Sequence, residues 1–219
     1  MHRGFFLLIM EKTITSLSPQ KYHSDRVNIY LDGEFAFGLP ANLACDLRIG
    51  DRLTLQRIEE LEAVAFLESA FQSALRLINY RPRTRKELSE RLQRKGYPQQ
   101  TILTIIERLT QMGLLNDEIF TRLWLESRSG SRPKSRRMLS YELQKKGISD
   151  EVLMPALSVI EEDEVLARRA LDMRHRKWQQ LDRQRFFNLA GAFLARRGFS
   201  YSTISKVLHE YWDAIQPAS

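Results

Sequence analysis

The sequence is poor in the residues that usually build disulfide-rich or metal-bound folds. Cys45 is the sole cysteine among 219 residues, which excludes an intramolecular disulfide and favours a reducing compartment. Four histidines beside one cysteine argue against a structural zinc site. No apolar run approaches the roughly 20 residues that cross a membrane. We therefore expect a cytoplasmic protein with no bound metal and no membrane segment.

Charge and hydropathy show what the chain does contain. Hydrophobic residues make up 43% and charged residues 28%, which predicts packed cores rather than disorder. Lys and Arg outnumber Asp and Glu by 34 to 27, and the isoelectric point is about 9.7. Residues 1–80 hold 8 basic and 10 acidic side chains, whereas residues 81–219 hold 26 and 17. This excess predicts that the C-terminal two thirds bind an acidic partner, and nucleic acid is the first candidate.

The first ten residues contain a short apolar run, Gly4 to Met10, behind His2 and Arg3. The run is at the lower limit for a signal peptide, and no small-residue cleavage site follows it. We expect instead that translation starts at Met10, or that the segment is an ordinary N-terminal strand.

The N-terminal part predicts a small β module. Residues 26–31 and 34–39 alternate as strands do, and Asp32-Gly33 between them is typical of a type I′ hairpin turn. Residues 52–55 predict another strand, and residues 14–17 a fourth. The module carries no cluster of catalytic groups, so we interpret it as a docking or stabilising unit. From Glu59 onward the apolar spacing becomes helical.

Three glycines, Gly96, Gly147 and Gly198, lie 51 residues apart and define an internal repeat. Two cations precede each glycine and an apolar residue follows it. A helix that ends in cations complements its dipole, and glycine suits the left-handed position after the last turn. Ser149 and Ser200 are then candidate N-caps. We expect a further helix before each unit, near residues 61–80, 117–128 and 162–178.

These patterns predict a mainly α protein of tandem three-helix repeats that form an elongated curved body, with a small N-terminal β module. The predicted boundaries are 1–60 for the β module and 61–115, 116–161 and 162–219 for the three repeats.

Cations recur in step with the repeat, and neutralising phosphates with Arg and Lys releases counterions. The pairs beside the glycines could either cap helices or bind a partner. The stretch 128–137 and the entry 81–86 carry more charge than capping requires, and we interpret 128–137 as a loop with a binding function. The candidate binding residues are Arg81, Arg83, Arg85, Lys86, Arg94, Lys95, Arg128, Arg132, Lys134, Arg136, Arg137, Lys145, Lys146, Arg196 and Arg197.

Other residues favour structural roles. Trp124, Trp178, Tyr211 and Trp212 occur in helical segments beside apolar residues, which indicates core packing. The acids at 117–118 and 161–164 stand at predicted helix N-termini and complement the helix dipole. The sequence has no phosphate-binding loop, dinucleotide glycine pattern or nucleophile motif. We therefore expect no catalytic residue, no cofactor and no enzymatic activity.

Three stretches resemble the RecX family of regulatory proteins. They are residues 81–88 with Leu92 and 95–97, residues 113–120, and Leu139 with 142–148. The resemblance covers about residues 62–215. The chain departs from it at Thr121, where the family often has alanine, and in the less regular stretch 129–135.

The resemblance implies a non-enzymatic modulator of the RecA recombinase. It implies tandem three-helix repeats that lie in the groove of the RecA–DNA filament and restrain its ATPase activity, strand exchange and stimulation of LexA self-cleavage. The expected partners are the RecA filament and, through it, single- or double-stranded DNA, with the protein a monomer. Two alternatives stay open: a RecA-independent DNA-binding protein with helix–turn–helix geometry, and an enzyme such as a nuclease.

Overall fold

The structure is a computed structural model, and it describes residues 11–20 and 23–215. The N-terminal segment 1–10, with its two candidate start sites, lies outside the described residues. The chain forms two compact units. One contains the N-terminal module, helix α2 and residues 91–108, and the other contains residues 81–90 and the chain from Leu109 onward.

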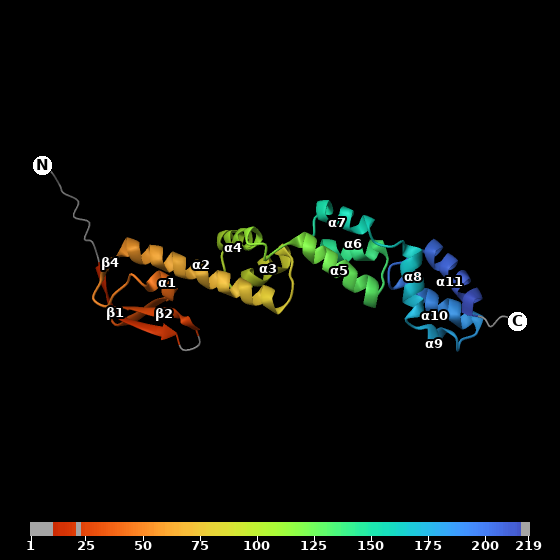
Figure 1. The fold of residues 1–219 in the computed structure, drawn as a ribbon, viewed down its shortest axis with the longest axis horizontal. Helices are drawn as coiled ribbons and strands as arrows, with labels where there is room; N and C mark the ends of the chain where they lie inside the picture. Colours follow the sequence, from red (N-terminus) through yellow and green to blue (C-terminus); the bar gives the residue numbers. More distant parts are fainter. Residues whose placement is uncertain (1–10, 21–22, 216–219) are drawn as a thin grey trace. The chain divides into compact units, whose positions relative to one another are not determined.

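The first unit begins with a four-stranded antiparallel sheet (Figure 1). Strands β1 (Glu11–Gln20), β2 (His23–Leu31), β3 (Glu34–Pro40) and β4 (Arg52–Thr54) lie in the order β3-β2-β1-β4. Asp32 and Gly33 have φ of 51° and 89°, as the hairpin turn between β2 and β3 requires. The structure thus confirms the four predicted strands and the turn.

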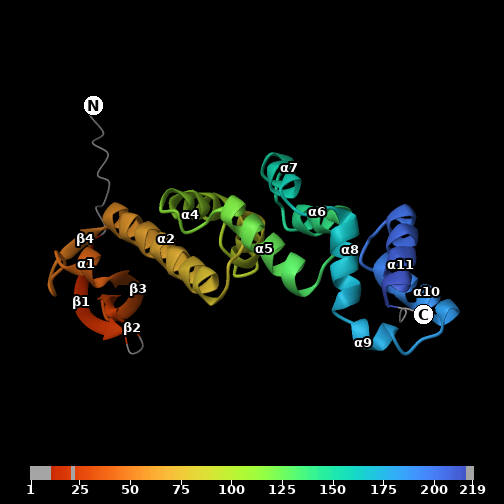
Figure 2. The same cartoon turned by 45° about the vertical axis from the view of Figure 1, so that its right-hand side comes forward.

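Two helices belong to the same part of the chain as these strands. The short helix α1 (Ala41–Ala44) precedes β4, and α2 (Leu55–Tyr80) lies along one side of the sheet (Figures 1 and 2). Ile58, Leu61 and Ala65 of α2 complete the apolar core of the sheet with Ile14 and Ile29. Helix α2 begins four residues before the expected change of period at Glu59. Its first turn, apart from buried Ile58, is exposed and therefore carries no helical signature in the sequence.

The remainder of the chain is helical. After α2 come α3 (Arg85–Gln93) and α4 (Gln99–Gln111), which complete the first repeat. The second repeat contains α5 (Asp117–Ser131), α6 (Arg136–Lys145) and α7 (Asp150–Ser158). The third contains α8 (Asp163–Asp172), the single turn α9 (His175–Trp178), α10 (Arg183–Ala195) and α11 (Tyr201–Ile215) (Figure 2). The predicted class, mainly α with tandem three-helix repeats and a small β module, is confirmed.

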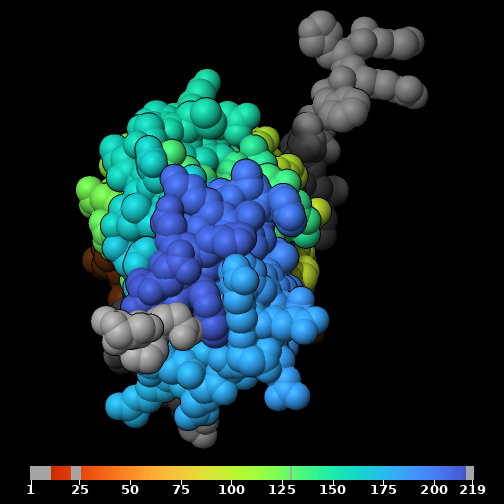
Figure 3. All heavy atoms as spheres, turned by 90° about the vertical axis from the view of Figure 1, so that its right-hand side faces the viewer, coloured from red at the N-terminus to blue at the C-terminus, as the bar shows by residue number. Residues whose placement is uncertain are grey.

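Each of the last two repeats has its own apolar core. Phe120, Leu139 and Leu153 are buried in the second repeat. The third is more aromatic, because Trp178 and Tyr211 are nearly inaccessible and pack with Phe186. Figure 3 faces this repeat, with α11 in dark blue beside the lighter blue segment of α9 and α10. The predicted core roles of Trp178 and Tyr211 are confirmed.

Two local predictions were wrong. The stretch 128–137 is not one loop, because α5 continues to Ser131 and α6 begins at Arg136. The expected helix 162–178 is divided at Met173 and Arg174, which separate α8 from α9. Both differences lie inside a repeat, between α5 and α6 and between α8 and α9, and local composition does not mark these helix ends. The domain boundaries stay a prediction. Among the described residues, no helix is both long and apolar enough to span a membrane.

Candidate functional site at the repeat junctions

The three repeat glycines have the same backbone setting. Their φ angles are +87°, +83° and +87° at Gly96, Gly147 and Gly198. Each glycine N–H donates to the carbonyl oxygen three residues earlier at 2.9 Å, and the next N–H donates to the carbonyl of a buried leucine five residues earlier. This pair of hydrogen bonds defines the Schellman cap. The sequence repeat therefore corresponds to three equivalent helix-ending turns.

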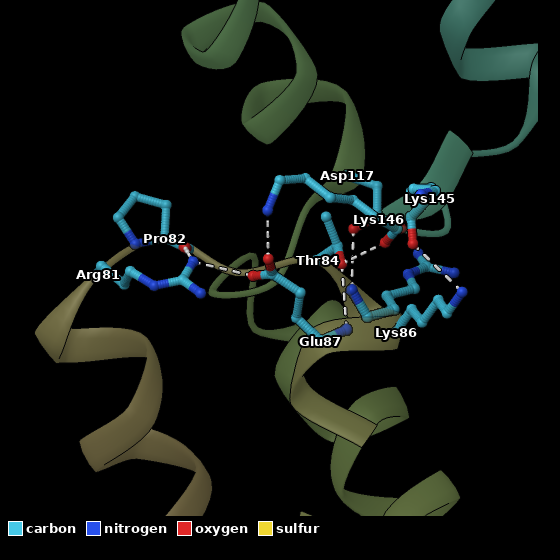
Figure 4. Close-up of polar contacts among 9 residues, drawn as sticks. Arg81, Pro82, Thr84, Lys86, Glu87, Asp117, Lys145 and Lys146 are labelled. Atoms are coloured by element: carbon cyan, nitrogen blue, oxygen red, sulfur yellow. Dashed lines mark hydrogen bonds and ion pairs between the residues drawn. The ribbon is translucent and has the colours of Figure 1, made fainter. Parts of the chain in front are cut away.

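The start of α3 docks on the second of these turns (Figure 4). The hydroxyl of Thr84 accepts a hydrogen bond from the Glu87 N–H at 3.1 Å, which caps the helix. The same hydroxyl donates to the carbonyl oxygen of Lys146 at 2.6 Å. A methyl group at Gly147 would lie 2.5 Å from the Lys86 Cβ, so glycine is also required by this close approach. We call this contact the first junction.

The start of α6 docks on the third turn in the same way. Ser135, 51 residues after Thr84, accepts from the Met138 N–H at 3.1 Å and donates to the carbonyl oxygen of Gly198 at 2.8 Å. A methyl group at Gly198 would lie 2.7 Å from the Ser135 hydroxyl oxygen. We call this contact the second junction. Gly96 differs, since a methyl group there would meet no described atom within 4 Å.

One carboxylate supports each junction. Asp117 accepts from the Arg85 N–H at 3.0 Å, and Asp163 accepts from the Arg136 N–H at 2.8 Å. Burial raises the pKa of Asp117 above its usual value of 3.8, against the lowering effect of the hydrogen bond and charge of Arg85. From the sequence, these acids were expected only to complement the dipoles of their own helices. Their shared position at the start of each repeat was the signal that could have identified this second role.

At the first junction two cations form ion pairs within the protein. Glu87 pairs with Lys146 at 2.5 Å and with Arg81 at 2.9 Å. Burial raises the pKa of Glu87, but these two ion pairs outweigh it and hold the pKa below 4.5. Lys134 is likewise bonded to Glu142.

An aromatic side chain lies beside these ion pairs. Lys146 and Arg128 lie 4.5 and 4.4 Å from the centre of the Trp124 indole ring, in a hollow of about 410 Å³. Lys86 and Lys145 line the same hollow, and the Lys86 ammonium donates to the Lys145 carbonyl at 3.2 Å. The half-buried Trp124 thus has cation contacts as well as its core contacts.

The second junction has a different charge balance. Met138 stands where the first junction has Glu87, so Arg197, the counterpart of Lys146, has no carboxylate opposite it. Arg197 and Arg174 lie 4.3 and 4.6 Å from the centre of the Phe193 ring. Burial, followed by the charges of Arg174, Arg132 and Arg196, lowers the pKa of Arg197.

These four arginines, Arg132, Arg174, Arg196 and Arg197, form a cluster that we call the arginine cluster. Within residues 11–20 and 23–215, none of them forms an ion pair with a carboxylate. The Arg197 Nε is buried and has no hydrogen-bond partner among the same residues. Uncompensated guanidinium groups bind phosphate and carboxylate oxygens well, so this cluster can bind an anionic partner.

Comparison with known sequences identifies the family. Residues 12–52 match the model "Regulatory protein RecX N-terminal domain", residues 70–109 match "RecX, first three-helix domain", and residues 116–157 match "RecX, second three-helix domain". The chain is 31% identical over 209 residues to regulatory protein RecX of Clostridium perfringens strain 13, with 89% of this chain and 94% of that protein covered. The chain belongs to the RecX family.

Other relatives agree with this assignment. Regulatory protein RecX of Bacillus pumilus is 30% identical over 204 residues, which is 91% of this chain and 78% of that protein. The fold is similar to a crystal structure titled "regulatory protein RecX", with a TM-score of 0.66, 23% identity and coverage of 90% of this chain and 98% of the other. A RecX structure from Lactobacillus salivarius gives a TM-score of 0.56 at 22% identity, covering 66% and 96%.

In this RecX-family chain the predicted binding residues divide into two groups. Eight are exposed: Arg85, Lys86, Arg94, Lys95, Arg132, Arg137, Lys145 and Arg196. The other seven are half-buried or buried: Arg81, Arg83, Arg128, Lys134, Arg136, Lys146 and Arg197. Arg136, for example, donates to the carbonyl oxygens of Ile160 and Glu161.

Arg174, a member of the arginine cluster, is absent from the predicted binding residues. It lies outside the repeat pattern, and the break between α8 and α9 brings it to Phe193. No group of three or more His, Cys, Asp or Glu side chains within the described part of the chain could hold a metal ion.

Proposed function

We propose that this RecX-family protein is a non-enzymatic regulator that binds the RecA–DNA filament. In this proposal it mainly inhibits the recombinase, ATPase and coprotease activities of RecA and so regulates DNA repair and the SOS response. It acts as a cytoplasmic monomer without a cofactor. The curated relatives are named regulatory proteins, which supports a regulatory rather than a catalytic role.

The observation that supports the proposal most strongly is the arginine cluster. Four guanidinium groups lie together at the second junction without a carboxylate partner among the described residues, whereas at the first junction Glu87 pairs with Lys146 and Arg81. A protein gains nothing in stability from this repulsion, but it gains affinity for phosphates and for acidic side chains. A filament that contains DNA offers both.

The proposal is tested with charge reversals of exposed cluster members. The variant Arg132→Glu/Arg174→Glu/Arg196→Glu leaves the half-buried Arg197 in place, so the fold should persist. We expect its inhibition of RecA ATPase on single-stranded DNA to require about tenfold more protein. The control Lys12→Glu/Arg48→Glu/Arg52→Glu changes the net charge equally at exposed positions of the N-terminal module. Equal inhibition by the cluster variant and wild type would contradict a role for the cluster.

Direct binding to DNA without RecA is the alternative, and the same arginine cluster favours it. It predicts tight binding to naked DNA with a steep salt dependence. A fluorescence anisotropy titration of labelled single-stranded DNA, with and without RecA, separates the two functions. Binding that becomes tight only on the RecA filament would reject the alternative. The elongated, curved form expected from the repeats stays a prediction, which small-angle X-ray scattering of the free protein tests.

A further inference from the structure

The second repeat contains a groove that the proposed function does not use. Helices α5 and α7 enclose it, and its volume is about 790 Å³. Leu125, Pro155 and Ala156 are among its apolar lining residues. At its edges Ile119 is 45% exposed and Val159 is 84% exposed, which is high for apolar side chains that lie together.

The third repeat shows why the groove is open. Helix α7 has nine residues, whereas its counterpart α11 has fifteen and covers α8 with its additional turns (Figure 2). In the third repeat Arg168 of α8 and Glu210 of α11 lie 3.9 Å apart and join the two helices. When α5 and α8 are aligned at their first residues, Arg168 corresponds to Arg122, and the residue 51 positions before Glu210 is the exposed Val159. These two residues cannot form an ion pair.

The edge of the groove is acidic. Four glutamates, Glu118, Glu126, Glu151 and Glu161, lie along it with a single cation, Arg122. Glu161 is bonded to Arg169 at 2.5 and 2.6 Å. The other three are exposed and form no ion pair within the described residues. Their charge contrasts with the net +7 of the whole chain.

We propose that this groove binds a helical segment of the recombinase protein that presents apolar side chains between lysines or arginines. The acidic edge repels phosphate, so DNA does not occupy the groove. The apolar floor accepts the nonpolar face of an amphipathic helix, and the three glutamates pair with its flanking cations. The inference rests on the proposed function and assigns the protein part of the filament to the groove and its anionic part to the arginine cluster.

Two variants test the groove. Glu118→Lys/Glu126→Lys/Glu151→Lys reverses the charge of its edge, and Val159→Ser removes exposed apolar surface without opening the core. We expect the triple variant to bind RecA filaments on single-stranded DNA about tenfold more weakly and Val159→Ser several-fold more weakly. On naked single-stranded DNA the triple variant should bind as well as wild type or better, because it gains positive charge. Opposite changes on the two substrates cannot arise from unfolding.

The matched control is Glu59→Lys/Glu62→Lys/Glu107→Lys, which gains the same charge at exposed positions of α2 and α4. It should not weaken binding to the filament. If the triple variant, Val159→Ser and wild type all bind the filament equally, the groove inference is overturned while the proposed function stands. If wild type itself does not bind the filament, both are overturned. A groove variant that changes the sedimentation-derived mass would assign the groove to a second copy of this chain and would also overturn the inference.

Discussion

Thr84 and Ser135 each use one hydroxyl group for two purposes. Each accepts a backbone hydrogen bond that caps its own helix and donates a second one to the glycine turn of the following repeat. Both side chains are fully buried, so neither bond could be exchanged for one to water. At the residue scale, the side chain three positions after each hydroxyl residue differs in charge: it is Glu87 at the first junction and Met138 at the second.

Met138→Glu tests that distinction, because it places a carboxylate where the first junction has Glu87. We expect the new carboxylate to pair with Arg197 and to weaken binding to RecA filaments by several-fold. Filament affinity measured by anisotropy, at matched thermal stability, checks the effect. The control is Met154→Glu, at an exposed methionine of α7. An unchanged affinity of Met138→Glu would show that the unpaired charge of Arg197 is not used.

Glu87→Gln tests the neutralised junction through its pH dependence. The pKa of Glu87 is lowered in the folded protein, so its ionisation stabilises the fold above the unfolded pKa, and this stability is lost as the pH falls through the folded pKa. We expect the substitution to cost about 1–2 kcal/mol at neutral pH. The difference from wild type should shrink well below pH 4.5, the ordinary value.

Urea unfolding at neutral pH and at a pH well below 4.5 measures the difference in stability between Glu87→Gln and wild type. Glu62→Gln, at an exposed position of α2, is the control and should show no comparable loss at neutral pH. A cost that is equal at neutral and at acidic pH would contradict the ion-pair explanation.

At the scale of elements, the three equivalent glycine turns differ in what they contact. The turns at Gly147 and Gly198 receive the start of a helix from the preceding repeat, and the turn at Gly96 receives none among the described residues. Glycine is therefore required for one reason at Gly96, the left-handed conformation. At Gly147 and Gly198 it is required for a second reason as well, the close approach of the docked helix.

The substitutions Gly96→Ala, Gly147→Ala and Gly198→Ala separate the two causes. Each should cost about 1–2 kcal/mol for the left-handed backbone. Gly147→Ala and Gly198→Ala should cost more, because their methyl groups would lie within 3 Å of Lys86, or of Ser135 and Met138. Chemical unfolding followed by circular dichroism, with each transition fitted separately, measures the difference. Equal costs at all three positions would contradict the close packing of the junctions.

At the scale of the whole molecule, the compact unit that contains residues 81–90 and the chain from Leu109 onward has two surfaces of opposite character. The arginine cluster is cationic and uncompensated, and the groove between α5 and α7 is apolar with an acidic edge. A partner with both anionic and basic surfaces would suit this combination better than a uniform polyanion.

Salt dependence tests how the whole molecule uses its charge. If the cluster contacts phosphates of single-stranded DNA, each lost contact should reduce the slope of log affinity against log salt by about 0.7. The Arg132→Glu/Arg174→Glu/Arg196→Glu variant should therefore show a slope on the filament that is smaller by about 2. An unchanged slope with weaker binding would assign these arginines to carboxylates of RecA instead of to phosphate.

The sequence by itself determined the features that depend on neighbouring residues. The hairpin at Asp32-Gly33 follows from the need for positive φ, and the turns at Gly96, Gly147 and Gly198 follow from the same need at a helix end. The repeat was readable because each glycine turn is built from residues within about one turn of helix.

Only the tertiary structure decided which cations are free. Thr84 bonds to a residue 62 positions away and Ser135 to one 63 positions away, and these distances along the chain carry no local pattern. Helix packing places Glu87 on Lys146 but Met138 by Gly198, and it brings Arg174 to a site outside the repeat register. The charge of each junction is a property of residues that meet through folding, because an ion pair depends on separation in space and not on separation in sequence.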